Sequence, residues 1–146
     1  MKLTGLYVFA ALAAGVTIGA GYTHMSSVSA STDLTCRGPA RAMGRLEMLF
    51  GTSRAQGGMV SDEEWSSFLD TEVTPRFPAG LTVLNGPGQW RGSDGKLTKE
   101  QSKILVIWHE PSSRAEADIE AIRSAYKGRF DQESVMRVDS LSCVSF

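Results

Sequence analysis

The chain has 146 residues, of which 42% are hydrophobic and 21% are charged, and its formal net charge is −1. This length and composition fit one globular domain and exclude an intrinsically disordered chain. The balance of charges argues against a nucleic-acid partner, because binding to phosphates depends on an excess of clustered Lys and Arg.

The start of the chain has the layout of a secretory signal peptide. Lys2 is its only formally charged residue before Asp33, and residues 6–20 are apolar and rich in small side chains. Val28 and Ala30 fit the two small-residue positions that signal peptidase recognises. We therefore expect cleavage after Ala30 and export to the periplasm or the extracellular space.

Three segments follow from this layout: a signal peptide over residues 1–30, an extended lead-in over 31–45 and a single domain over 46–146. After cleavage no membrane contact is expected. The alternative is an uncleaved anchor in the inner membrane formed by residues 3–22, which are long enough to span a bilayer but weakly hydrophobic because they contain several glycines.

The first predicted elements of the domain are a strand and a helix. Residues 46–50 alternate in part between apolar and polar side chains and stop at Gly51, which predicts a strand. Ser61 and Glu64 form a capping box, in which each side chain bonds the other residue's backbone amide. A helix follows until Pro75, with apolar residues at helical spacing: Trp65, Phe68, Leu69 and Val73.

Two further strands are predicted in the middle of the domain. Residues 81–84 are typical of a strand, and turn clusters follow at 85–88 and 93–96. Residues 104–108 are the most apolar run of the mature chain. Because this run does not alternate, we expect a central strand that is buried on both faces.

A second helix and a last strand complete the domain. Ser113 and Glu116 form another capping box, and Gly128 is suited to the left-handed residue at the helix end. Residues 135–138 predict the last strand. The helix between them has an apolar stripe: Ala115, Ile119, Ile122 and Tyr126.

The order strand, helix, strand, strand, helix, strand predicts an α+β fold of the ferredoxin-like, split-βαβ type (β-α-β-β-α-β). In this fold an antiparallel sheet carries two helices on one face, and the first and third strands are central. Leu49 and the run 104–108 would then leave apolar side chains on the uncovered face. The preferred hypothesis is a face-to-face homodimer. Alternatively, an apolar ligand or the N-terminal lead-in covers this face.

Two cysteines, Cys36 and Cys143, lie near the two ends of the mature chain. An oxidising compartment favours their pairing, and neither a CxxC spacing nor a neighbouring histidine cluster indicates a redox or metal site. The sequence thus predicts a structural disulfide. It would close a loop of about 100 residues and contribute up to about 4–5 kcal/mol in the chain-entropy model.

Several segments resemble one group of exported bacterial proteins. They are VSDEEWSSFLDTEVTPRFPAGLTVL, GQWRGSDG, SKILVIWH and the terminal SCVSF. The combination of TPRFP-GLTV with QWRG is specific, and over residues 46–146 the chain resembles the family named domain of unknown function 3574. The resemblance implies an exported single-domain protein and brings no established activity, cofactor or catalytic residue.

The sequence carries no motif of a familiar catalytic class, such as a Walker loop, GxSxG, HExxH or an EF-hand loop. His24 leaves with the signal peptide, so His109 is the only histidine of the mature chain. A multi-histidine metal site is excluded, and neither a metal nor a cofactor is expected.

Four residues are candidates for ligand binding: Trp90, Arg91, Asp94 and His109. Trp90 offers a ring for stacking and Arg91 a guanidinium for an anion, although a plain hairpin turn at Asp94-Gly95 explains the same residues structurally. His109 ends the apolar strand and titrates near neutral pH, or it is a satisfied strand-edge histidine.

These observations favour a non-catalytic exported domain that binds a small ligand or an envelope protein, rather than an enzyme. One alternative is a small enzyme similar to the dimeric α+β barrel monooxygenases, an analogy that rests on the fold alone. The other alternative is a structural component of the cell envelope.

Overall fold

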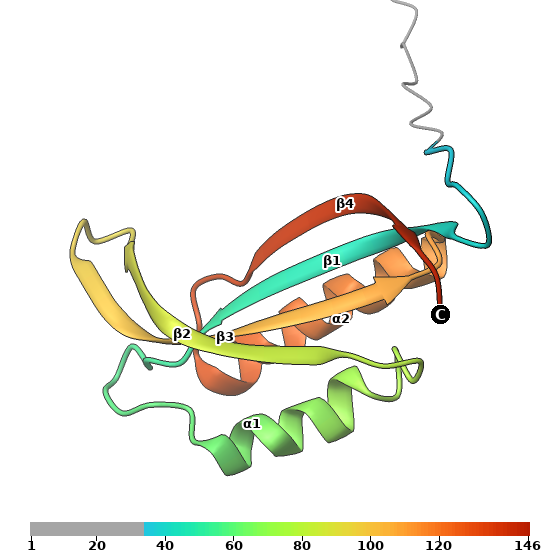
Figure 1. The fold of residues 1–146 in the computed structure, drawn as a ribbon. Helices are drawn as coiled ribbons and strands as arrows, with labels where there is room; N and C mark the ends of the chain where they lie inside the picture. Colours follow the sequence, from blue (N-terminus) through green and yellow to red (C-terminus); the bar gives the residue numbers. More distant parts are fainter. Residues whose placement is uncertain (1–33) are drawn as a thin grey trace, which may run out of the picture. The chain divides into compact units, whose positions relative to one another are not determined.

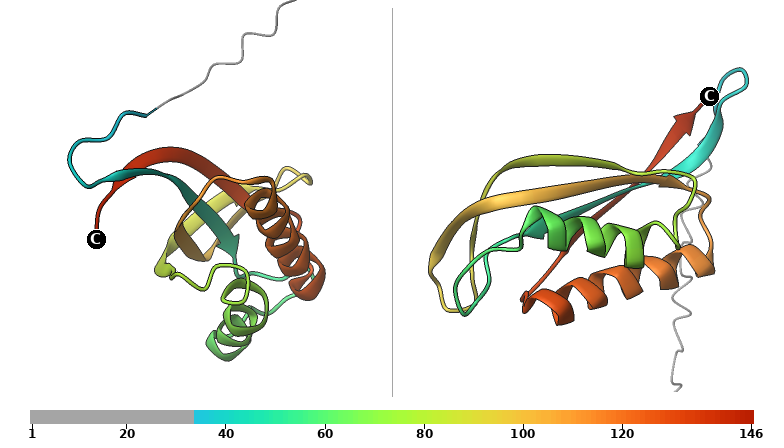
Figure 2. Two further views of the ribbon diagram at one scale, coloured as in Figure 1. Left: turned by 90° about the vertical axis from the view of Figure 1, so that its right-hand side faces the viewer. Right: turned by 90° about the horizontal axis from the view of Figure 1, so that it is seen from below.

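The computed structural model describes residues 34–146, so the predicted signal peptide and its cleavage site lie outside the described residues (Figure 1). In chain order the elements are β1 (Arg41–Gly51), α1 (Asp62–Phe68), the π-helical turn η1 (Leu69–Val73), β2 (Thr82–Arg91), β3 (Leu97–His109), α2 (Ser113–Phe130) and β4 (Met136–Val144). The four strands form one antiparallel sheet in the order β2-β3-β1-β4. Both helices lie on the same side of it (Figure 2). The predicted ferredoxin-like α+β fold, with the first and third strands central, is confirmed.

Alternation along the strands decides which side chains the helices cover. Leu46, Met48 and Phe50 of β1 are fully buried in the core, and their neighbours Ile107 and Leu105 on β3 lie with them. The intervening residues of each strand point to the other face of the sheet, which we call the open face. The core is completed by α1 and α2, through Trp65, Phe68, Ala115, Ile119, Ile122, Tyr126 and Phe130.

Four aromatic side chains from three elements meet at the centre of this core. They are Phe50 of β1, Trp65 and Phe68 of α1 and Tyr126 of α2. Every pair among them has ring centroids between 4.6 and 6.1 Å apart, mostly in edge-to-face arrangement. This aromatic cluster joins both helices to the central strand of the sheet.

The strands are longer than the sequence pattern predicts. β1 begins at Arg41, within the predicted lead-in, because it pairs with Val144 of β4 from its first residue. The turn predicted at 85–88 was wrong, since these residues continue β2. Pro87 lacks a backbone N–H, but a sheet tolerates it at an edge strand, and β2 is an edge.

Both helix starts are capped, although α2 is shifted from its prediction. The Ser61–Glu64 capping box is present as expected. In α2 the cap is Ser112, whose hydroxyl accepts from the Ala115 amide at 3.0 Å. The helix continues through Gly128, and Asp131 takes the left-handed position with φ of 54°. Burial of Phe130 explains the extra turn, because it extends the apolar stripe into the core.

The predicted disulfide is present, since Cys36 and Cys143 are bonded with their Cα atoms 5.5 Å apart. It ties the lead-in to the end of β4, where Cys143 pairs with Ala42 of β1. Met136 and Val138 of β4 stay exposed on the open face, so the described part of the lead-in does not cover them. None of the helices in residues 34–146 combines the length and hydropathy that a membrane crossing needs.

Arg137 of β4 ties the sheet to α2 through its guanidinium. It donates to the carboxylates of Glu116 at 2.7 Å and Glu120 at 3.1 Å, and to Asp139 on its own strand at 2.8 Å. Its hydrogen bond holds the pKa of Glu116 below the ordinary 4.5. Arg123, followed by Arg137, lowers the pKa of Glu120 in the same way.

This network makes stability depend on pH in acid. A carboxyl whose pKa is depressed by folding stabilises the fold above its unfolded pKa, and this contribution is lost as the pH falls through the folded pKa. We expect the free energy of unfolding to decrease from about pH 5 downward, and Arg137→Met to flatten that decrease. Urea unfolding across this pH range measures it, with Lys99→Met as a charge-matched control that keeps the wild-type slope. If the free energy of unfolding fell equally steeply with pH in both variants, the pH dependence would not come from the Arg137 network.

Candidate functional site

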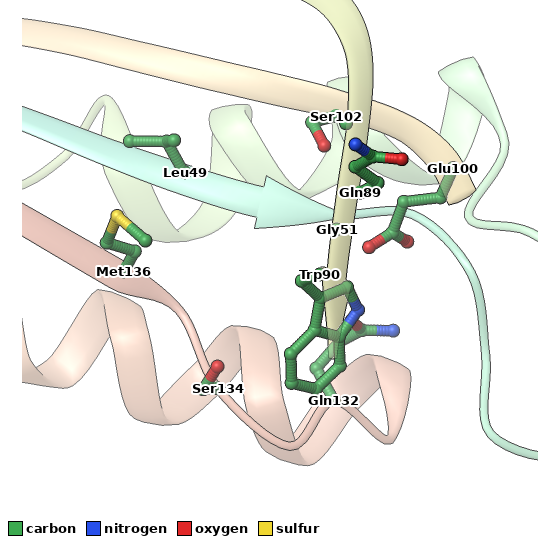
Figure 3. A pocket seen from close by; sticks show the side chains of 10 residues that line it. Leu49, Gly51, Gln89, Trp90, Glu100, Ser102, Gln132, Ser134 and Met136 are labelled. Carbon is green, nitrogen blue, oxygen red and sulfur yellow. The ribbon is translucent and has the colours of Figure 1, made fainter. Parts of the chain in front are cut away.

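A hollow of about 180 Å³ lies on the open face, near the end of β1. There the β2–β3 hairpin curls away from the helices (Figure 1). We call it the Trp90–Glu100 hollow, and its lining is drawn in Figure 3: Leu49, Gly51, Gly88, Gln89, Trp90, Glu100, Ser102, Gln132, Ser134 and Met136.

Two glycines make room for the polar side chains in this hollow. A Cβ atom on Gly51 would stand 2.5 Å from Oε1 of Glu100, and one on Gly88 would overlap the hydroxyl of Ser102. The register explains this, because Gly51 pairs with Ser102 on one side of β3 and Gly88 pairs with Glu100 on the other. Glu100 and Ser102 therefore lie over bare backbone of the neighbouring strands.

The Glu100 carboxylate is held in place from the loop that follows β1. Its Oε2 accepts from the backbone amide of Ser53 at 2.7 Å. The side-chain amide of Gln132 donates to the backbone carbonyl of Ser53, also at 2.7 Å. This bond fixes the loop to the end of α2. Within residues 34–146 no hydrogen bond reaches Oε1 of Glu100, so this oxygen is free to accept one from a ligand.

The aromatic cluster supports the floor of the hollow from below. The Tyr126 hydroxyl donates to the carbonyl of Gly51 at 2.9 Å. Burial, and secondarily the negative charge of Glu100, raises the pKa of this phenol well above its ordinary 10.0. The hydroxyl therefore stays protonated at all physiological pH values and remains a donor.

Apolar groups form the rest of the wall. The Trp90 side chain reaches from β2 toward Gln132, and Leu49 and Met136 lie at the other side of the hollow (Figure 3). The Trp90 side chain is partly exposed, so part of its ring faces solvent. The hollow thus combines an aromatic ring and an apolar wall with one fixed carboxylate.

Of the four residues proposed from sequence, the structure places only Trp90 in this hollow. Arg91 alternates to the opposite face of β2 and donates to the Gly95 carbonyl at 2.6 Å. Asp94 lies in the hairpin turn, where the Lys96 amide donates to it at 2.9 Å and lowers its pKa. These two residues stabilise the turn between β2 and β3.

His109 lies at the other end of the sheet, in a second hollow of about 290 Å³. Its ring packs edge-on against Phe77 at 5.8 Å between centroids. It also covers Gly44, where a Cβ atom would stand 2.9 Å from the imidazole. Gly44 and Gly51 lie at opposite ends of the pairing between β1 and β3, so His109 and Trp90 do not share a site.

Sequence reasoning did not select Glu100, Ser102 or Gln132. The available signal was the pair Gly86 and Gly88 around Pro87, which is unusual within a strand and marks a close approach. The same Gly and Pro residues are also typical of a turn, which is the structure that the sequence alone predicts here. Within residues 34–146 no group of three or more His, Cys, Asp or Glu side chains is placed to hold a metal ion.

These features define a small, disulfide-linked, ferredoxin-like domain whose uncovered sheet face carries a largely apolar hollow with one fixed carboxylate. A family model described as protein of unknown function (DUF3574) matches residues 45–146. The chain belongs to this family, as its sequence resemblance suggested. Comparison with curated proteins gave no significant match.

Two solved structures show the same fold. A phage SAM lyase in complex with S-methyl-5′-thioadenosine is similar with a TM-score of 0.57 and 13% identity, covering 80% of this chain and 97% of the lyase. A phage SAM lyase in the apo state is similar with a TM-score of 0.54 and 14% identity, covering 77% and 95%. At such identities the likeness extends to the fold alone.

Proposed function

We propose that this chain is an exported binding protein that takes a small molecule in the Trp90–Glu100 hollow without transforming it. The observation that carries the proposal is the Glu100 carboxylate, which is fixed by the Ser53 amide beside the exposed ring of Trp90. Sites for small molecules combine apolar walls with a few placed polar groups. The hollow has this composition.

The same side chains indicate the chemistry of the ligand. A carboxylate is an acceptor, so it selects a hydrogen-bond donor and above all a protonated amine. Trp90 binds the face of a flat or apolar group, and it also attracts a cation. We therefore propose a compact amine with an aromatic or aliphatic portion as the class of ligand.

Binding rather than catalysis is proposed because Glu100 acts alone. Its fixed partner is a backbone amide, and His109 lies at the far end of the sheet. A catalytic site for acid–base or nucleophilic chemistry usually combines several such groups, for example a base with a nucleophile or with donors that stabilise developing charge. The side chains around Glu100 in this hollow are amides, hydroxyls and apolar groups.

Export is part of the proposal. The signal-like start of the chain supports it, and so does the disulfide, because such bonds persist in oxidising compartments. N-terminal sequencing of the protein recovered from the periplasm tests it. A first residue of Ser31 is expected, and an intact Met1 would contradict cleavage.

Phenethylamine is a suitable probe for the hollow. We expect it to shift the NMR signals of the Trp90 indole and of the Gly51 and Gly88 amides, and Glu100→Gln to weaken its binding by about 10- to 100-fold. The loss reflects a charge-assisted hydrogen bond worth about 1.5–3 kcal/mol. Trp90→Ala should weaken it as well, through loss of stacking.

Two controls make this experiment specific. Asp70→Asn removes an equal charge from the exposed side of η1, away from the open face, and should leave the affinity unchanged. Phenethyl alcohol keeps the ring but lacks the cation, so it should bind more weakly to the wild type and be insensitive to Glu100→Gln. Shifts centred on His109, or equal affinity of all variants for the amine, would refute the proposed site.

A further inference from the structure

The open face carries a continuous apolar patch across all four strands. The register joins its members, since Leu49 pairs with Ile104 and Met136, and Ile104 also pairs with Leu84. Val106 and Val138 flank Glu47 one step further along β1. Leu84, Met136 and Val138 are exposed. A soluble monomer seldom leaves a joined patch of this kind in water, which indicates a partner.

Two charged side chains in the middle of this patch indicate what kind of partner covers it. Arg45 and Glu47 lie two residues apart on the open face of β1. Their side chains form an ion pair, with 2.7 Å between Nη2 of Arg45 and Oε1 of Glu47. The Arg45 guanidinium lies over the Trp108 ring at 5.7 Å, and its Nε atom is buried without a hydrogen-bond partner among the described residues. The face therefore presents one cation and one anion side by side on its central strand.

Such a pair is complementary to itself. A two-fold axis that passes near Leu46 reverses the direction of β1, so Arg45 of each copy faces Glu47 of the other. Two sheets that pack face to face do so about 10 Å apart, a gap that apolar side chains of the size of Leu, Met and Val fill. A foreign partner would have to supply the same charge pattern independently.

We propose that a second copy of this chain packs on the open face, with Arg45 and Glu47 forming reciprocal ion pairs across a two-fold axis near Leu46. Val138, which is exposed in the single chain, then becomes buried in the contact. Gly51 lies five residues from the axis along β1, roughly 16 Å away, so the Trp90–Glu100 hollow is at the rim of the contact. Leu49 and Met136 belong both to the patch and to the wall of the hollow, but the test of the dimer uses no ligand and does not depend on the proposed function.

The mass of the protein purified from the periplasm after expression of the full chain tests the proposal. Light scattering at high micromolar concentration should give the mass of two chains. Val138→Glu should raise the dissociation constant of the dimer by at least about 100-fold, because a carboxylate in an apolar contact loses its hydration without a partner. A wild-type mass of one chain, with or without a bound apolar molecule in native mass spectra, would overturn the proposal.

A matched variant and a charge swap separate this interface from general damage. Leu141 is on the same strand as Val138 and almost equally exposed (39% against 44%), but it alternates to the other face, so Leu141→Glu should keep the dimer. Arg45→Glu should weaken the dimer by placing like charges together, and Arg45→Glu combined with Glu47→Arg should restore it. Equal effects of the Val138 and Leu141 variants, or failure of the swap to restore dimerisation, would refute the assigned contact.

Discussion

Replacing both cysteines by serine is expected to lower the free energy of unfolding by about 2–5 kcal/mol. Cys36 and Cys143 are 107 residues apart in sequence, so their bond encloses every strand and helix of the domain. A crosslink stabilises mainly by restricting the unfolded chain, and the effect grows with loop length to about 4.7 kcal/mol for about 100 residues. The whole free energy of unfolding of a small domain is about 5–15 kcal/mol, so this loss is a large share of its stability.

Equilibrium urea unfolding of three samples measures this effect: the oxidised wild type, the reduced wild type, and the Cys36→Ser, Cys143→Ser double variant. The last two should coincide at a lower midpoint. The double variant is used because a single substitution leaves a free thiol that can form intermolecular bonds. Superimposable curves for all three samples would show that the disulfide does not constrain the unfolded chain.

Phe68→Ala is expected to cost about 3–5 kcal/mol, the range for removing a buried aromatic side chain. Phe68 is fully buried in the aromatic cluster, with its ring centroid 5.1 Å from that of Tyr126 and 5.8 Å from that of Trp65. It also packs on Phe130 at 5.9 Å. Because Trp65 and Phe68 are the buried residues of the short helix α1, the truncation removes one of its two anchors in the core.

Urea unfolding gives the size of this loss, and amide exchange along α1 shows whether the helix becomes locally unprotected. Met59→Ala is the control, since this side chain is mostly exposed just before α1 and should change stability by no more than about 0.5 kcal/mol. A loss below about 1 kcal/mol for Phe68→Ala would mean that the cluster repacks around the cavity.

In the edge strand β2, the same short segment protects the edge of the sheet and makes room for the hollow. Pro87 withholds an N–H from the exposed edge, and glycines on both sides of it leave that part of the edge without side chains. Proline is one of the devices that protect sheet edges from pairing with other chains. Because Gly88 also makes room for the Ser102 hydroxyl, Gly88→Ala would alter both properties together.

Local patterns determined the order of elements, the central position of β3 and the start of α1. The Ser61–Glu64 capping box depends on residues three apart, and the run from Ile104 to Trp108 is apolar whatever surrounds it. The disulfide followed from the presence of only two cysteines in a chain with an export-like start. Signals of this kind act within a few residues or on the chain as a whole, so they can be recognised without tertiary structure.

The tertiary structure alone decided where β2 and α2 end and which side chains share a site. Pro87 stays in a strand because β2 is an edge, and α2 passes Gly128 because Phe130 is buried in the core. The hollow depends on the register that brings Gly51, Gly88 and Glu100 together from three strands. Register sets which residues meet across a sheet, and it results from the packing of the whole domain, so no local pattern carries it.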